Sequence, residues 1–155
     1  MGEVHAEVTL VNLRGADNAG SGFIPESEVR RLAVSALVDT GAWPLVINEE
    51  TRQKLGLRVE EPRETTVTEG VKIPGRITEY VEIRRKDRKT ACEAVVLSNK
   101  EGVLLGAYPL EGMDLMAHPQ RQEVIGAHGG KIRNAVKQPG QGPENTNRRG
   151  SCTYT

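Results

Sequence analysis

Aromatic residues are scarce in this sequence, which contains one Trp, three Tyr and one Phe among 155 residues. The hydrophobic core must therefore consist mainly of Val, Leu, Ile and Ala side chains, and only 37% of all residues are hydrophobic. A chain of this length forms one domain, or one domain followed by a tail. The aliphatic, β-branched composition favours a small β-rich body with a thin core.

Cysteine is also scarce, and two residues cannot form a disulfide framework. Cys92 lies in a strand-like run and Cys152 in a polar segment, so we expect two free thiols in a reducing compartment. The sequence begins with no charged-then-apolar signal segment, and it contains no run of about 18 apolar residues. We therefore expect a cytoplasmic protein with no membrane partner.

Neither sign of charge is in excess, because 21 basic residues balance 21 acidic residues. This balance gives no indication of a nucleic-acid partner. Residues 126–155 differ from the rest, because they contain five basic side chains, one acidic side chain, several Gly and almost nothing apolar. We expect residues 1–125 to form the folded domain and residues 126–155 to be a disordered basic tail. Residues 1–125 hold the other 16 basic and 20 acidic residues, so the alternative is a tail that folds back on this acidic body or contacts RNA.

Alternation of apolar and polar residues predicts a mainly β domain. The strand expected at 3–13 would place Val4, Ala6, Val8 and Leu10 on one face, and the strand at 28–41 would enter the core near Ala36. Further strands are expected at 43–47, in three runs between 63 and 97, at the start of 102–115, and at 120–125.

Two other segments have local signals of their own. Residues 14–27 are rich in Gly, Asn, Asp and Ser, and we expect them to form a long loop. A short helix is expected over residues 48–57, because Asn48 can cap it and Gly56 can end it.

In the sequence ALVDTG at residues 36–41, an aspartate lies at the end of a predicted buried strand. Such an aspartate costs free energy unless it forms a turn, binds a metal or takes part in catalysis. Asp-Thr-Gly is a common turn sequence, so the tripeptide alone is weak evidence for catalysis. We expect no metal, because the three histidines share no ligand spacing with one another or with a carboxylate cluster. These are His5, His118 and His128.

Serine or cysteine chemistry has little support in the sequence. Ser35 and Ser98 lack a G-x-S-x-G setting, and Cys92 has no evident histidine partner.

The order of motifs is more specific than Asp-Thr-Gly by itself. A predicted strand–turn–strand with a Gly tip follows at residues 65–80, and an apolar run ends in glycine at Leu104-Leu105-Gly106 before a short helix. Over roughly residues 3–125, this order resembles the retropepsin-like aspartic proteases, most closely their small single-domain prokaryotic members. The resemblance implies a mainly β fold, a closed β-barrel or acid-protease half-lobe with one or two short helices and a flap hairpin.

The resemblance also implies roles for individual residues. Asp39 matches the catalytic carboxylate, Thr40 the threonine whose hydroxyl holds two active-site loops together across a dimer, and Gly41 the glycine that allows close approach. The segment 104–106 would pack beneath this loop. Substrate-binding roles are implied for Ala42, Trp43 and the flap tip Thr68, Glu69 and Gly70, with Pro74-Gly75 as the second choice for the tip.

Two positions depart from the family pattern. Trp43 stands where a small polar residue is common, so it either fills a substrate subsite or packs, and we slightly favour packing. Ala107 follows Gly106 where viral members have arginine or asparagine. The ion pair that braces viral dimers is therefore expected to be absent.

The chain supplies only one Asp-Thr-Gly, whereas this chemistry requires two carboxylates. We therefore expect an aspartic endopeptidase that works as a homodimer on peptide or protein substrates, without a cofactor. One alternative is a non-catalytic dimerisation or peptide-binding module that keeps the fold. The other is a plain β-barrel domain with a chance Asp-Thr-Gly.

Overall fold

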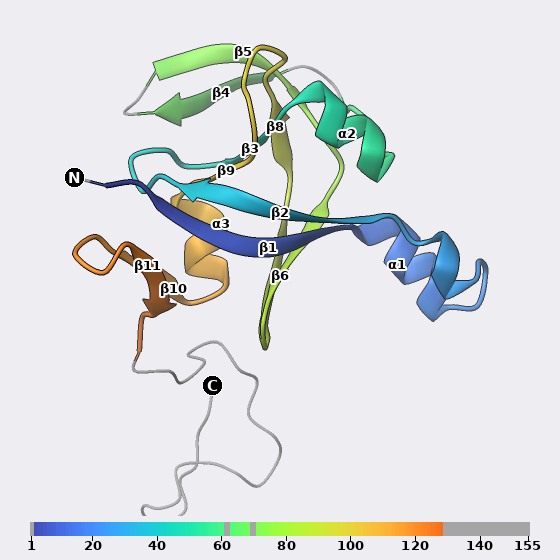
Figure 1. The fold of residues 1–155 in the computed structure, drawn as a ribbon. Helices are drawn as coiled ribbons and strands as arrows, with labels where there is room; N and C mark the ends of the chain where they lie inside the picture. The colour runs from blue at the N-terminus through green and yellow to red at the C-terminus, as the bar shows by residue number, and fades with distance from the viewer. Residues whose placement is uncertain (1, 61–62, 69–70, 129–155) are drawn as a thin grey trace, which may run out of the picture.

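The computed structural model describes residues 2–60, 63–68 and 71–128 (Figure 1). Within them, nine strands form one sheet in the order β4-β5-β8-β3-β9-β2-β1-β6-β7, and β10 and β11 form a second. The strands of the large sheet are β1 Val4–Asn12, β2 Arg31–Val38, β3 Leu45–Ile47, β4 Arg63–Thr68, β5 Val71–Ile77, β6 Val81–Arg85, β7 Arg88–Cys92, β8 Ala94–Val96 and β9 Leu104–Leu105. The other elements are α1 Leu13–Gly20, the 3-10 helix Glu26–Glu28, α2 Glu49–Leu55, α3 Ala107–Gly112, β10 Leu115–His118 and β11 Glu123–Gly126.

The mainly β class expected from the sequence is confirmed. The large sheet ends at β4 on one side and at β7 on the other. These two strands do not pair with each other, so the sheet stays open rather than closing into a barrel. No helix in the described part of the chain is long and apolar enough to cross a membrane.

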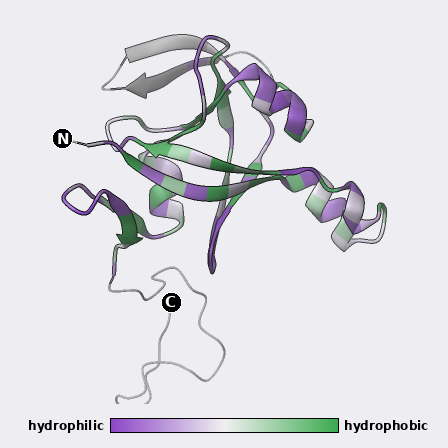
Figure 2. Cartoon of the chain, in the orientation of Figure 1, coloured by the Kyte–Doolittle hydropathy of each residue, from purple (hydrophilic) through white to green (hydrophobic). Residues whose placement is uncertain are grey.

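The long antiparallel pair of β1 and β2 carries the core. Its register runs from Val4 opposite Val38 to Val11 opposite Arg31. Val4, Ala6, Val8 and Leu10 are all buried, as the alternation predicted, and Ala36 and Val38 are buried where β2 enters the core. Figure 2 shows this alternation along β1 and β2, whereas α2 is mostly hydrophilic.

The prediction of a loop over residues 14–27 was wrong outside residues 21–25, because the rest of the segment lies in α1 and the 3-10 helix. The buried Asn12 side chain starts α1 by accepting a hydrogen bond from the Gly15 N–H at 3.0 Å. Its amide also donates to the Leu55 carbonyl at 2.8 Å, which ties the start of α1 to the end of α2. No residue of α1 is buried, so the sequence offered no apolar stripe from which to predict a helix.

The helix predicted at 48–57 is confirmed as α2. Asn48 caps it by accepting a hydrogen bond from the Thr51 N–H at 2.8 Å. Gly56 ends it in the left-handed region, with φ of +65°. Both ends follow the local signals that the sequence carried.

The segment from 63 to 97 contains five strands rather than the three runs expected. The predicted turn within 85–89 joins β6 to β7, with Lys86 at a positive φ. A further break falls at Thr78, whose fully buried hydroxyl donates to the Glu79 carbonyl and accepts from the Ala94 N–H. These hydrogen bonds hold Thr78 between the end of β5 and the start of β6, and they tie it to the start of β8.

The C-terminal end of the described chain is a two-stranded ribbon. β10 was not predicted from the sequence, whereas β11 forms close to the predicted strand 120–125. The buried Asp114 holds the ribbon, since its carboxylate lies 3.8 Å from the buried Arg88 and 2.7 Å from His128. Of the predicted tail, residues 129–155 lie outside the described residues.

Candidate active site

Asp39 lies directly after β2, at the point where three strands of the large sheet meet. β9 runs parallel to β2 and antiparallel to β3, so it is hydrogen-bonded between them. The Asp39 N–H donates to the Leu105 carbonyl at 3.0 Å, which continues the β2–β9 pairing by one residue. The position of Asp39 is therefore fixed by two strands that are far apart in the sequence.

The loop after Asp39 is a tight turn. The Gly41 N–H donates to Asp39 Oδ1 at 2.9 Å, and the Ala42 N–H donates to the Asp39 carbonyl at 3.1 Å. Thr40 and Gly41 are exposed, and Asp39 itself is partly exposed. Asp39 therefore does form the turn that its sequence predicted, but its carboxylate reaches the surface instead of being buried.

The electrostatic surroundings of this carboxylate are simple. Among the described residues, no basic side chain lies within ion-pair distance of Asp39. The Gly41 N–H orients one carboxylate oxygen, and the second oxygen is left for solvent or for another molecule. A carboxylate held in this way is oriented and remains available for chemistry.

Gly106 brings the start of α3 against the active-site loop. A Cβ atom at this position would lie 2.4 Å from the Pro44 carbonyl oxygen and 2.6 Å from the Trp43 carbonyl carbon, so only glycine fits. Backbone hydrogen bonds join the two segments, from Gly106 to Pro44, from Ala107 to Ala42 and from Tyr108 to Trp43, at 2.8–2.9 Å. The structure thus brings the segment 104–106 together with the Asp-Thr-Gly loop.

Ala42 and Trp43 differ in their surroundings. Ala42 is buried in a small cluster with Val46 and Leu104. Trp43 is 51% exposed, and its ring lies 5.4 Å from the Tyr108 ring at a 45° tilt. This aromatic contact joins the loop after Asp39 to the first turn of α3.

The expected hairpin is present as β4 and β5. Its register places Thr68 opposite Val71, and a bulge interrupts the pairing between Thr66 and Thr68. Of the preferred tip, Thr68 ends β4, whereas Glu69 and Gly70 lie outside the described residues. The second choice for the tip was wrong, because Pro74 and Gly75 pair with β4 well inside the hairpin.

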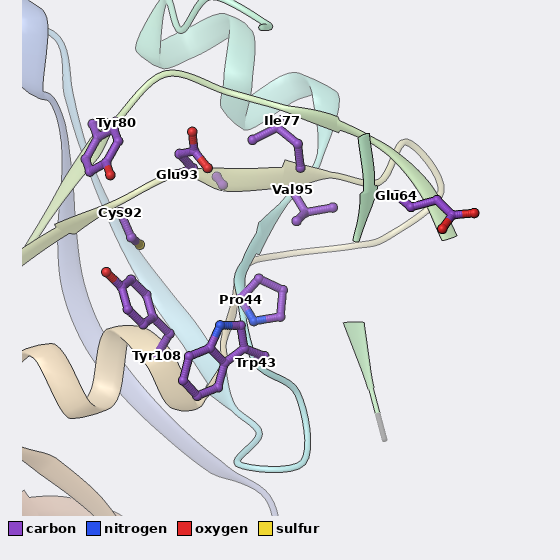
Figure 3. A pocket seen from close by; sticks show the side chains of 10 residues that line it. Trp43, Pro44, Glu64, Ile77, Tyr80, Cys92, Glu93, Val95 and Tyr108 are labelled. Atoms are coloured by element: carbon purple, nitrogen blue, oxygen red, sulfur yellow. The ribbon is translucent and has the colours of Figure 1, made fainter. Parts of the chain in front are cut away.

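A cavity of about 310 Å³ opens beside Trp43 (Figure 3). Tyr80 and Tyr108 line it together with Trp43 and the buried Cys92. Sequence analysis did not identify Tyr80 and Tyr108 as site residues. The one feature of the sequence that could have pointed to these two tyrosines is the scarcity of aromatic residues in the chain.

The Cys92 thiol is a poor nucleophile in this setting. Burial, reinforced by the negative charge of Glu93, raises the pKa of Cys92 to about 12. The thiolate is the reactive form of cysteine, and it is nearly absent at neutral pH under these conditions. Cysteine chemistry at this cavity is therefore disfavoured.

Comparisons with known proteins agree with this geometry. A family model described as "Aspartyl protease" matches residues 26–108, more than half of the chain. No curated protein sequence matches the chain.

Two solved structures are similar to this one. The chain is similar to the retroviral protease-like domain of Ddi1 from Leishmania major, with a TM-score of 0.51, 15% identity, and coverage of 87% of this chain and 91% of that one. It is also similar to a retropepsin-like aspartic protease from Rickettsia conorii, with a TM-score of 0.45, 18% identity, and coverage of 76% and 86%. The Leishmania domain confirms the expected retropepsin-like fold, and the family match shows that this chain belongs to the aspartyl protease family.

Proposed function

We propose that the protein is an aspartic endopeptidase, in which two copies of Asp39, one from each chain of a homodimer, activate a water molecule. The observation that carries the proposal is the partly exposed Asp39 carboxylate, oriented by the Gly41 N–H in a loop anchored to Leu105. Membership of the aspartyl protease family supports a protease-like hydrolase.

The reaction requires two carboxylates that share one proton. The ionised carboxylate takes a proton from a water molecule, whose oxygen attacks the peptide carbonyl carbon. The protonated carboxylate donates a hydrogen bond to the carbonyl oxygen, and a proton then passes to the leaving amine. Two carboxylates about 3 Å apart cannot both be ionised, so the pair divides the acid and base roles. The water adds directly, and no acyl-enzyme forms.

The need for two carboxylates leads to the homodimer. Asp17, Asp87 and Asp114 lack the Thr-Gly that follows Asp39, and Asp114 is buried against Arg88. A twofold axis beside the Asp-Thr-Gly loop would bring the two Asp39 side chains together. The exposure of Thr40 and Gly41 supports this arrangement, because both are accessible to a second chain.

The orientation of Asp39 fits its proposed role. The hydrogen bond from Gly41 occupies only one carboxylate oxygen, which leaves the other oxygen to contact the water or the second aspartate. We also propose that the β4–β5 hairpin is the flap that covers the substrate, with residues 68–70 at its tip. Figure 1 shows the hairpin and the loop after β2 at the same end of the molecule.

The test is Asp39→Asn, assayed on a mixed peptide library. We expect hydrolysis to fall by orders of magnitude, because an amide supplies neither the base nor the acid. The thermal unfolding midpoint should be retained, since the asparagine oxygen can still accept the Gly41 hydrogen bond. Asp87→Asn, in the exposed turn between β6 and β7, is the matched control and should retain full activity.

Two further measurements distinguish the alternatives. Excess Asp39→Asn chains should inhibit the wild-type protein, because a mixed dimer holds a single carboxylate. The wild-type rate should follow a bell-shaped pH profile on the acidic side of neutrality. Retained hydrolysis by purified Asp39→Asn protein would refute the aspartic mechanism. A dimer that depends on Asp39 but hydrolyses no peptide would favour the non-catalytic module.

A further inference from the structure

Two of the few aromatic residues of this chain, Trp43 and Tyr108, form a pair beside the Asp-Thr-Gly loop. Trp43 comes from the segment before β3 and Tyr108 from helix α3, so the fold brings them together. Trp43 is 51% exposed and Tyr108 is 45% exposed. Figure 3 shows the two side chains next to each other, across the cavity from Tyr80. The Trp43–Tyr108 pair is therefore an apolar surface that a single chain leaves half uncovered.

Backbone hydrogen bonds fix the two segments that carry the pair. The Tyr108 N–H donates to the Trp43 carbonyl at 2.9 Å, and the Ala107 N–H donates to the Ala42 carbonyl at 2.8 Å. Because a preorganised surface loses less conformational freedom on association, side chains held in this way are suited to binding. Trp and Tyr are also enriched at the centres of protein interfaces, where they supply much of the binding energy.

The residues next to Asp39 supply little attraction between two chains. The proposed catalytic centre brings two Asp39 carboxylates together, and these repel each other unless they share a proton. Thr40 and Gly41 are exposed but have small side chains. Of the large apolar side chains that the described residues leave exposed, Trp43 is the nearest to Asp39 along the chain. Apolar attraction beside the two loops is therefore expected to come from Trp43 and its neighbour Tyr108.

The distance from Trp43 to the proposed twofold axis can be bounded. The Ala42 nitrogen lies 3.1 Å from the Asp39 carbonyl oxygen, and the Trp43 Cα lies at most about 5 Å beyond that nitrogen. The Asp39 side chain adds about 5 Å, and carboxylates about 3 Å apart lie roughly 2 Å from the axis. The Trp43 Cα is therefore within about 15 Å of the axis. A standard interface of about 800 Å² per chain, spread evenly around the axis, has a radius of about 16 Å and covers Trp43.

We propose that the Trp43–Tyr108 pair packs against a second copy of this chain and braces the homodimer beside its two Asp39 loops. A fully covered aromatic side chain buries about 150–250 Å², so each half-exposed ring offers about 100 Å². The four rings of a dimer would supply about 400 Å², a quarter of a standard interface of about 1,600 Å². The proposal rests on the proposed function, which requires the second copy, and it adds the surface that holds the two copies together.

The wild-type protein can report this contact itself, because Trp43 is the only tryptophan in the chain. Tryptophan emission moves to longer wavelength when water reaches the ring. Dilution of the full-length protein through its dimer dissociation constant should therefore shift the emission to the red. Sedimentation velocity on the same dilution series measures the fraction of dimer. We expect the two curves to coincide, since the ring becomes exposed when the dimer separates.

Variants assign the contact to the pair. Trp43→Ala and Tyr108→Ala should each raise the dimer dissociation constant about tenfold or more. Their hydrolysis per chain should be low in dilute solution and recover as the protein is concentrated, because the catalytic groups are intact. Tyr80→Ala, on the other side of the same cavity, and Phe23→Ala, 78% exposed after α1, are controls that should leave the dimer unchanged. Thermal unfolding verifies that each variant is folded.

The outcomes separate this proposal from the proposed function. A wild-type dimer whose Trp43 emission stays constant on dissociation, or which both pair variants leave intact, would overturn the brace alone. Pair variants that raise KM for peptides without weakening the dimer would assign the pair to the substrate and also overturn the brace. A protein that stays monomeric at any accessible concentration would overturn both proposals. A dimer that depends on the pair but cleaves no peptide would refute the endopeptidase function and leave the brace standing.

Discussion

Gly106→Ala is the substitution with the most direct structural consequence. The new methyl carbon would lie 2.4 Å from the Pro44 carbonyl oxygen, whereas ordinary contacts of this kind begin near 3.4 Å. The start of α3 and the loop before β3 must therefore separate by about 1 Å. The three backbone hydrogen bonds that join them, now 2.8–2.9 Å long, lie across the widened gap.

The expected loss of stability can be worked out from these contacts. Losing two of the three hydrogen bonds costs about 2 kcal/mol, at about 1 kcal/mol each. Forcing a methyl group into a packed site costs a further 1–3 kcal/mol or so. We therefore expect a loss of about 3–5 kcal/mol in the free energy of unfolding, which lowers the midpoint by roughly 10 °C for a chain of this size.

Urea and thermal unfolding measure this effect, with Gly20→Ala as the matched control. Gly20 is the last residue of α1, and a Cβ atom there would have no neighbour within 4 Å. Gly20→Ala should therefore leave stability unchanged or raise it slightly. Unfolding midpoints within about 2 °C of each other for the two variants would show that the close approach at Gly106 is not a real constraint.

Three further predictions concern the supports of the fold and its tail. Asn12→Ala should lower the free energy of unfolding in urea by about 2–4 kcal/mol, because it removes both the α1 cap and the buried hydrogen bond to Leu55. The control Asn48→Ala removes only a helix cap and should cost about 1 kcal/mol. Burial alone would raise the pKa of Glu79, but hydrogen bonds from Arg14 and from the Arg58 N–H lower this pKa overall. The ionised Glu79 therefore stabilises the fold fully above its ordinary pKa, and this stabilisation is lost as the pH falls. The difference in unfolding midpoint between wild type and Glu79→Gln should therefore be largest near neutral pH and shrink below pH 4.5, and a constant difference would contradict this. Deleting residues 130–155 should leave the unfolding midpoint and the activity nearly unchanged, and a drop of several degrees would count against a dispensable tail.

Local patterns predicted the elements whose signals lie in neighbouring residues. The alternation of Val4, Ala6, Val8 and Leu10 identified the buried face of β1 because a strand has a period of two. Asn48 and Gly56 identified both ends of α2 because capping depends on residues within one turn. Helix α1 was missed because it lacks such a local pattern: no residue in it is buried, and no apolar stripe runs along it.

Long-range arrangements were harder to predict. The Asp-Thr-Gly turn is local, and Gly41 could be assigned to it, but the contact of Gly106 with Pro44 followed only from a family resemblance. The aromatic cavity unites residues from three separate segments, around positions 43, 80 and 108. No periodicity in a sequence encodes such a convergence, which depends on how the strands are ordered in the sheet.

The bond from the Asp39 N–H to the Leu105 carbonyl also affects the order of folding. This bond closes a loop that runs from residue 39 to residue 105, and the length of that loop alone costs about 4 kcal/mol in chain entropy. Contacts between residues distant in the sequence form late for this reason. During synthesis, β1, β2 and α2 leave the ribosome well before β9 does. The Asp39 loop can take its final shape only after Leu105 has emerged and inserted between β2 and β3. A nascent chain therefore carries its aspartate in an unformed loop, which would delay any proteolytic activity until most of the domain has been made.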